Sequence, residues 1–225
     1  MLARFGDPVK MPGEPKRERV ISYIDGFNLY FGIKASDSKH HLWLDLLALS
    51  RNLSMPFQDV VEVKYFTSRI SGPGSKQRRQ STYLDALGTL DKTLFRIFFG
   101  KYQDEPQKCR LCGREDTVSH EKMTDVNIAV EMMRDAFQDR FDTALLISAD
   151  SDLCPPVSAI RSLFPEKRVV VGFPPARRST ELANVASNKF VVGRVNLAKS
   201  QFPVEIRTSS GVVLKKPETW APNPQ

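Results

Sequence analysis

Apolar runs that alternate with helical segments constrain the fold of this chain more than any other feature. Short runs typical of strands recur at 20–25, 59–70, 93–102, 141–148, 168–173 and 190–195. Segments with helical character lie between them, at 41–53, 75–91, 124–140, 155–164 and 179–187. Strands separated by helices pair in parallel and are covered on both faces, so we expect an α/β fold with a mainly parallel sheet.

Two of the helical segments carry a clear apolar stripe, which is expected to face the core. In 41–53 the stripe consists of Leu42, Leu46, Leu49 and Leu53. In 124–140, where Thr124 is the expected capping residue, it consists of Val126, Ala129, Val130, Met133 and Phe137. The segment 103–122 is polar and is expected to be a loop.

The chain divides into three parts on the same grounds. Residues 1–18 are expected to be a flexible arm, 19–195 the α/β domain, and 196–225 a short C-terminal tail with a small hairpin. No apolar run reaches the ~18 residues needed to cross a bilayer, and residues 1–19 lack the apolar centre of a signal peptide. Three cysteines, an odd number, argue against a disulfide framework, so the expected compartment is the cytoplasm.

Aspartates follow two strand-like runs that lie far apart in the sequence. Asp25 ends the first run, and Asp150 and Asp152 follow the run 141–148. The carboxyl ends of parallel strands open onto one crevice. Asp125 lies at the start of a predicted helix, where the helix dipole favours an anion. Because gathered carboxylates repel one another unless a cation holds them, and Mg²⁺ and Mn²⁺ prefer oxygen ligands, the pattern predicts a divalent-metal site.

Three segments carry these acids in order: YIDGFNLY at 23–30, EKMTDVNIA at 121–129 and LISADSD at 146–152. Together they resemble the NYN domain of the PIN-like nucleases, most closely its bacterial LabA-like branch. The resemblance covers roughly residues 18–195 and implies a three-layer α/β/α sandwich with a central, mainly parallel sheet.

The resemblance also implies a metal-dependent endoribonuclease, in which the motif acids bind Mg²⁺ or Mn²⁺ and activate water to cut RNA. Carried over by position, the metal-binding and catalytic acids are Asp25, Asp125, Asp150 and Asp152, with Asn28 beside them. Met123 and Leu153 stand where the family commonly has Gly and Phe, and neither change affects a carboxylate. Whether one ion or two is bound stays open.

Basic residues are the candidates for contacts with a polyanionic substrate, because 33 Lys and Arg against 26 Asp and Glu give a net charge of +7. Lys76, Arg78 and Arg79 either follow a phosphate backbone or form a solvated helix face. Tyr30 either stacks on a base or belongs to the core. RNA, single-stranded or structured, is therefore the expected partner, no membrane is expected, and a homo-oligomer is left open.

A half zinc site is present in the polar segment. Cys109 and Cys112 form a CxxC pair, and His120 follows eight residues later. A closed structural zinc site needs four ligands, and this segment supplies three. Reduced thiols or a redox pair are therefore favoured over Zn²⁺.

Two other functions fit part of the pattern. A catalytically weak RNA-binding or regulatory module would keep the fold, but it has no evident reason to gather four carboxylates. A phosphatase-like hydrolase requires a second Asp two residues after its nucleophile, whereas Asp25 is followed by Gly26 and Phe27. The sequence thus favours the nuclease.

Overall fold

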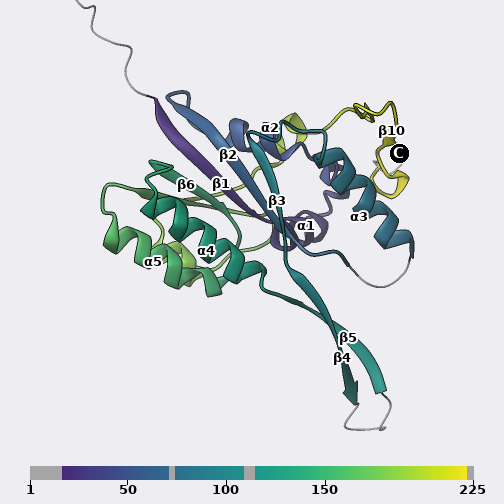
Figure 1. Cartoon of the computed structure of the whole chain (residues 1–225), viewed down its shortest axis with the longest axis horizontal. Helices are drawn as coiled ribbons and strands as arrows, with labels where there is room; N and C mark the ends of the chain where they lie inside the picture. Colours follow the sequence, from purple (N-terminus) through teal and green to yellow (C-terminus); the bar gives the residue numbers. More distant parts are fainter. Residues whose placement is uncertain (1–16, 71–73, 109–114, 222–225) are drawn as a thin grey trace, which may run out of the picture.

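A six-stranded parallel sheet forms the centre of the molecule, seen here in a computed structural model that describes residues 17–70, 74–108 and 115–221 (Figure 1). The strand order is β3–β2–β1–β6–β7–β8, and every pairing in this sheet is parallel. The predicted α/β class is confirmed. All but the last two residues of the predicted arm, 1–18, lie outside the described residues. The strands are β1 (Glu18–Asp25), β2 (Gln58–Thr67), β3 (Phe95–Phe99), β6 (Thr143–Ile147), β7 (Arg168–Phe173) and β8 (Asn188–Val191).

Helices cover both faces of the sheet, and each face has its own apolar core (Figure 1). One face carries α1 (Gly26–Ala35), α2 (Leu46–Leu53), α3 (Gly74–Leu87) and α7 (Arg194–Lys199). The other carries α4 (Thr124–Phe137), α5 (Cys154–Leu163) and α6 (Thr180–Val185). This arrangement is the three-layer sandwich that the resemblance implied.

The order of the strands reverses between β1 and β6. The chain first builds outward from β1 through β2 to β3, and then returns to place β6 on the other side of β1. The two strands pair from Val20 opposite Thr143 to Ile24 opposite Ile147. In open α/β sheets such a reversal leaves a crevice beyond the carboxyl ends of the two strands. Asp25 and the segment after β6 therefore lie at the same edge.

Helix α1 begins directly after β1 and comes very close to β2. A Cβ atom on Gly26 would lie 2.7 Å from the carbonyl oxygen of Phe66 and 2.7 Å from the hydroxyl of Tyr65. Only glycine fits this approach without moving the backbone of β2. Gly26 thus fixes the first turn of α1 beside the end of the sheet.

Several element boundaries differ from the sequence prediction by a few residues. The helix predicted at 41–53 begins only at Leu46, because the side chain of Asp45 accepts a hydrogen bond from the Ala48 N–H at 2.8 Å and caps α2. The strand predicted at 190–195 ends at Val191, and Arg194 already begins α7.

Three of the five residues in the apolar stripe that was predicted to bury α4 face solvent instead, whereas Ala129 and Met133 are half-buried and Met133 packs against the core. Val126, Val130 and Phe137 are 61%, 56% and 66% exposed, whereas Ile128 and Met132 are fully buried. The two sets are offset by two positions, which is about 200° on a helix of 3.6 residues per turn. The predicted core face was therefore wrong by roughly half a turn of the helix.

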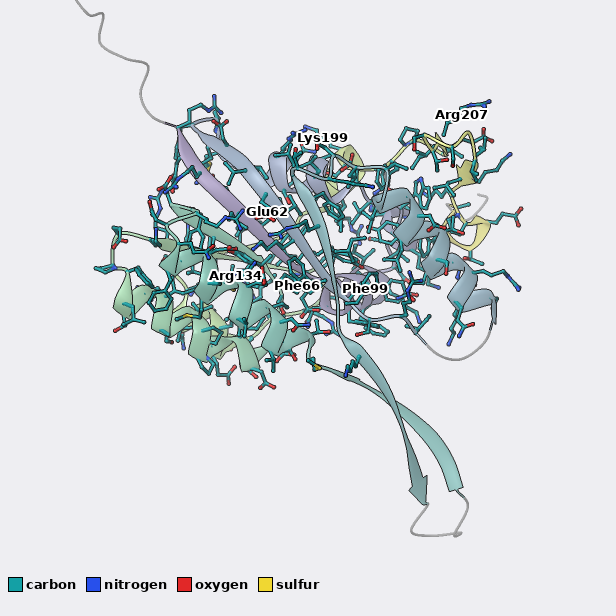
Figure 2. All side chains as sticks on the ribbon, viewed as in Figure 1. Glu62, Phe66, Phe99, Arg134, Lys199 and Arg207 are labelled. Atoms are coloured by element: carbon teal, nitrogen blue, oxygen red, sulfur yellow. The ribbon has the colours of Figure 1, made fainter. Side chains whose placement is uncertain are left out.

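A buried ion network explains this orientation. Lys64 of β2 is fully buried, and its Nζ donates to Glu131 at 2.7 Å and to Asp135 at 2.5 Å, both on α4. Glu62 and Arg134, which Figure 2 labels on β2 and α4, extend the network through Lys64 and Glu131. A buried charge is tolerated only with partners. The helix must therefore turn its acids inward and leave the valines outside.

Met123, and not the predicted Thr124, occupies the cap position of α4. Its backbone has φ 78° and ψ −8°, the left-handed conformation that costs a non-glycine residue roughly 1–2 kcal/mol. Thr124 is the first residue of the helix itself. The glycine that stands here in NYN-like sequences thus has a conformational reason.

Met123→Gly is expected to raise the free energy of unfolding by about 0.5–1 kcal/mol. Glycine removes the left-handed strain, and its larger loss of chain freedom offsets part of the gain. Urea denaturation is the measurement. Met123→Ala is the matched control, since alanine keeps the strain. Equal stability of the glycine and alanine variants would show that the left-handed conformation at position 123 is not strained.

A two-stranded hairpin replaces the loop predicted at 103–122. β4 (Lys101–Lys108) and β5 (Glu115–Lys122) pair antiparallel and project from the body of the molecule (Figure 1). Its polar sequence lacks the apolar alternation that marks a half-buried strand, and a ribbon held by backbone hydrogen bonds does not require it. Cys109 and Cys112 lie outside the described residues, and for His120 only the backbone, in β5, is described. The preference for reduced thiols or a redox pair over Zn²⁺ therefore stays a prediction.

The C-terminal segment packs back onto the domain. β9 (Glu205–Arg207) pairs antiparallel with β10 (Val213–Lys215), and a short 3-10 helix, η3 (Glu218–Trp220), follows. Trp220 is 6% exposed, and its ring centroid lies 6.4 Å from that of Trp43 and 5.9 Å from that of Tyr83. Trp220 therefore belongs to the core beside α3. None of the helices in the described ranges is long and apolar enough to span a membrane.

Candidate active site at the carboxyl edge of the sheet

Asp25 is the most constrained of the predicted site residues. It ends β1, caps α1 and is only 2% exposed. Its Oδ1 accepts a hydrogen bond from the backbone N–H of Asn28 at 3.0 Å. Its Oδ2 accepts from the Asn28 side-chain amide at 2.6 Å and from the Ser148 hydroxyl at 2.8 Å. Burial raises the pKa of Asp25, and the nearby Asp150 raises it further, while the hydrogen bonds oppose the change.

The end of β6 brings Asp150 to the same place. The buried hydroxyl of Ser148, which donates to Asp25, also accepts from the backbone N–H of Asp150 at 3.1 Å. The carboxylate of Asp150 accepts from the backbone N–H of Asp152 at 3.0 Å and starts the 3-10 helix η2 (Ser151–Leu153). Asp150 is half-buried, and Asp152 is exposed. The structure therefore joins Asp25 and Asp150 through Ser148 and leaves Asp152 at the rim.

Asp125 reaches this edge by another route. It is the second residue of α4 and is half-buried. Helix α4 packs against η2, the turn that follows Asp150. The N-terminal end of α4 thus lies at the same edge of the sheet as the other three acids.

Arg177 is a site residue that the sequence did not single out. It lies in the loop after β7, and its Nη1 donates to the side-chain oxygen of Asn28 at 3.0 Å. Its guanidinium carbon is 5.7 Å from the centroid of the Phe31 ring. Arg177 follows a strand of the parallel sheet, and loops at the carboxyl ends of such strands face the crevice, so its position in the sequence was one available signal. Nothing in the sequence distinguishes Arg177 from its neighbour Arg178.

Cys154 and Glu181 mark the far side of the same acidic region. The pKa of the half-buried Cys154 thiol is raised by burial first, and then by the charges of Glu181, Asp150 and Asp152. These surroundings disfavour the thiolate, the form that acts as a nucleophile or metal ligand. Glu181, on α6, was not among the predicted residues.

The donor set fits a hydrated divalent ion better than a closed metal cage. Within the described residues, no three His, Cys, Asp or Glu side chains are close enough to hold an ion on their own. Mg²⁺ usually takes one or two carboxylates and keeps several waters. Asp25 and Asp150 are the two acids that the structure links here, because Ser148 donates to the Asp25 carboxylate and accepts from the backbone N–H of Asp150.

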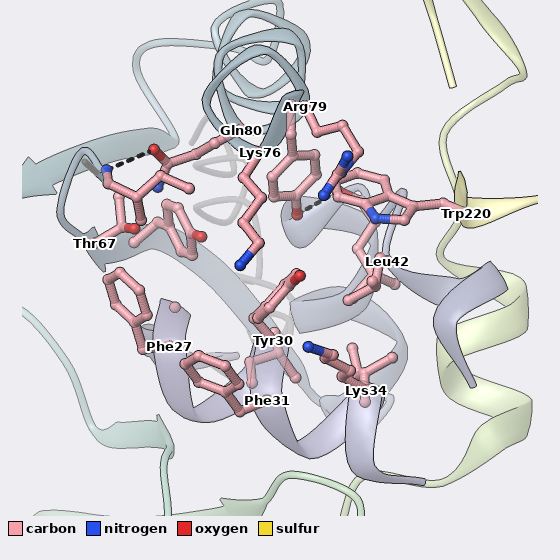
Figure 3. A pocket seen from close by; sticks show the side chains of 17 residues that line it. Phe27, Tyr30, Phe31, Lys34, Leu42, Thr67, Lys76, Arg79, Gln80 and Trp220 are labelled. Atoms are coloured by element: carbon pink, nitrogen blue, oxygen red, sulfur yellow. Dashed lines mark hydrogen bonds between the residues drawn. The ribbon is translucent and has the colours of Figure 1, made fainter. Parts of the chain in front are cut away.

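The residues predicted to contact RNA fall into two groups. Tyr30, Lys76 and Arg79 line one cavity between α1 and α3 (Figure 3). Arg78 is exposed on α3 and is not part of that lining. Gly26, the residue directly after Asp25, is one of the residues that line the cavity. The cavity and the carboxylates therefore adjoin the two sides of the first turn of α1.

Comparison with known proteins gives a family and a fold. The chain is 26% identical to the 6-hydroxy-3-succinoylpyridine 3-monooxygenase HspA of Pseudomonas putida, over 96% of this chain and 79% of that protein. It resembles the crystal structure of a protein of unknown function from Vibrio parahaemolyticus, with a TM-score of 0.53 and 21% identity over 81% of this chain and 98% of the other. This second likeness concerns the fold alone. The family model of the NYN domain matches residues 19–197. The chain therefore belongs to the NYN domain family.

Proposed function

We propose that the protein is an endoribonuclease that uses Mg²⁺ or Mn²⁺. The observation that carries the proposal is the Asp25–Ser148–Asp150 cluster at the point where the strand order of an NYN domain reverses. NYN domains generally act on RNA, and the two carboxylates form a pair that a hydrated divalent ion suits. The net charge of +7 favours a polyanionic substrate.

Asp25 and Asp150 would hold the ion, with Asp125 and Asp152 at the same edge. When bound, the ion supplies a water of lowered pKa and offsets negative charge on the phosphate. Asn28 fixes the orientation of the Asp25 carboxylate by two hydrogen bonds. A carboxylate held this way keeps its position when the substrate enters.

Arg177 would bind the phosphate that is to be cut. Its side chain is exposed, and among the described residues its guanidinium donates one hydrogen bond, to Asn28, so further N–H groups remain for phosphate oxygens. This contact places the scissile phosphate beside the carboxylates. It also neutralises charge that the acids would otherwise repel.

Cleavage of end-labelled single-stranded RNA tests the proposal. Purified protein is incubated with Mg²⁺, with Mn²⁺, or with a chelator, and products are resolved by length. Internal cuts are expected with either metal and none with the chelator. RNA that is bound but never cut with any metal would leave the regulatory RNA-binding module as the function.

A second candidate is oxidation of an aromatic acid, and one observation favours it. The relative from Pseudomonas putida is named as a monooxygenase of 6-hydroxy-3-succinoylpyridine, a heteroaromatic ring with an anionic side chain. The cavity between α1 and α3 has aromatic and cationic walls that suit such a compound. Oxygen consumption with this compound and a reduced nicotinamide as electron donor is the test. Oxygen-dependent product without RNA cleavage would displace the nuclease proposal.

A further inference from the structure

The cavity between α1 and α3 has aromatic walls on several sides. Its volume is about 240 Å³. Phe27 and Tyr30 of α1, Tyr65 of β2, Tyr83 of α3 and Trp220 of η3 all line it (Figure 3). Flat aromatic walls favour a flat ligand, because stacked rings attract one another beyond the area that they bury. The space is below the ~300–1,000 Å³ of drug-sized pockets and suits a single ring with one attached group.

The same cavity is positively charged. Lys34 reaches into it from α1 and Lys76 from α3, and Arg79 of α3 also lines it (Figure 3). None of the described residues that line it is acidic. Within the described part of the chain, no carboxylate forms an ion pair with Lys34, Lys76 or Arg79. Cations gathered without a carboxylate favour an anionic ligand.

A short series of contacts connects the cavity with the carboxylates. Phe31 lines the cavity, and its ring lies 5.2 Å from that of Tyr30. The guanidinium of Arg177 lies 5.7 Å from the same Phe31 ring and donates to Asn28, which in turn bonds Asp25. The cavity and the acids therefore lie on the two sides of the contacts that Phe31, Arg177 and Asn28 make with one another.

We propose that the cavity binds one unpaired nucleotide of the RNA, next to the phosphate that is cut. The base stacks among Tyr30, Tyr83 and Trp220, and its phosphate is held by Lys34 and Lys76. A base inside a duplex is stacked and paired and cannot enter, so the cavity selects single-stranded RNA. This inference rests on the proposed nuclease function for its substrate, but nucleotide binding can be tested without cleavage.

Isothermal titration with four probes separates the contributions of ring and anion. The probes are uridine 5′-monophosphate, uridine, ribose 5-phosphate and benzoate. The nucleotide is expected to bind at least about tenfold more tightly than uridine or ribose 5-phosphate, since a charge-assisted contact and a stacked ring each contribute to affinity. Equal affinity for ribose 5-phosphate would remove the ring from the proposal. Tighter binding of benzoate would assign the cavity to a free aromatic acid and overturn the nucleotide.

Two lysine variants and a matched control locate the binding. Lys34→Ala and Lys76→Ala are expected to weaken nucleotide binding about tenfold or more. Arg78→Ala removes a neighbouring charge of α3 outside the cavity and is expected to leave binding unchanged. Equal losses in the Lys76 and Arg78 variants would show that the effect is general charge and would overturn the assignment. Circular dichroism verifies that each variant keeps the fold.

RNA cleavage, measured in the same proteins, separates the two proposals. Nucleotide binding that depends on Lys76 in a protein that never cuts RNA would keep the cavity and remove the nuclease. Cleavage whose KM for single-stranded RNA is unchanged by Lys34→Ala and Lys76→Ala would keep the nuclease and remove the cavity. Equal cleavage of single-stranded and duplex RNA of the same sequence would also overturn selection by the cavity.

Discussion

Asp25→Asn is expected to lower the rate of RNA cleavage by about two to four orders of magnitude, the range that a positioned acid–base or metal-binding group contributes. The substitution removes the buried carboxylate charge and retains its shape. Single-turnover cleavage with saturating Mn²⁺ is the measurement. Asp85→Asn, which removes an exposed carboxylate from α3, is the matched control and is expected to cleave at the wild-type rate. Unchanged cleavage by the Asp25 variant would remove this residue from the site.

The same variant is expected to be at least as stable as the wild type at neutral pH in the presence of a chelator. Burial raises the pKa of Asp25 in the folded protein. For an acid with a raised pKa, the stabilisation is complete below the unfolded pKa and is lost as the pH rises through the folded pKa. Asparagine avoids that loss, and the Ser148 hydroxyl can rotate to accept a hydrogen bond from the new amide. The Asn28 side-chain amide, which donates to the same oxygen in the wild type, can flip to present its own oxygen, and it then gives up its hydrogen bond from Arg177. A variant less stable than wild type by several kcal/mol would mean that Asp25 is a structural residue.

Lys64→Met is expected to lower the free energy of unfolding by about 3–5 kcal/mol, the usual cost of removing one partner from a buried ion pair. Glu131 and Asp135 would remain buried without their buried cation, and the more exposed Arg134 and Arg140 would still be paired with them. In a domain of this size such a loss lowers Tm by on the order of 10 °C. Urea and thermal denaturation provide the measurement.

Two further variants test whether the loss of stability comes from the buried ion network. Lys92→Met, at an exposed position, is expected to stay within about 0.5 kcal/mol of wild type. The triple variant Lys64→Met, Glu131→Gln and Asp135→Asn is expected to recover part of the loss, because it leaves no uncompensated charge. If Lys64→Met is as mild as Lys92→Met, the network does not hold α4 in place.

The fold class and the edge that carries the acids could be predicted from the sequence. The apolar runs that became β1 and β6 are buried on both faces, so their composition alone marked them as central strands. Asp25 and Asp150 were placed at one edge because parallel strands share the direction of their carboxyl ends. Ser148, whose hydroxyl links Asp25 with Asp150, belongs to the segment LISADSD at 146–152. Its hydrogen bond to Asp25 depends on the pairing of β1 with β6, which the segment itself does not reveal.

The parts that could not be predicted depend on partners far apart in the sequence. The inward face of α4 is set by Lys64, which is fully buried in β2. Lysine is usually exposed, so residue type alone would place this side chain at the surface. Arg177 reaches Asn28 across 149 positions of the chain. Trp220 joins the core through contacts with Trp43 and Tyr83, which no local pattern indicates. Hydrophobic periodicity reports only whether a face is apolar, and these contacts are set by particular pairs.

Trp220 lies beyond residues 19–197, the part of the chain that the NYN family model matches, yet it forms one wall of the cavity. The carboxylates lie wholly within the matched part. Substitutions of Trp220 would therefore reshape this wall of the cavity while the carboxylates of the proposed nuclease site stay as they are. Part of the proposed selectivity thus lies outside the stretch that the family shares, and that part can change among relatives without a change in the acids.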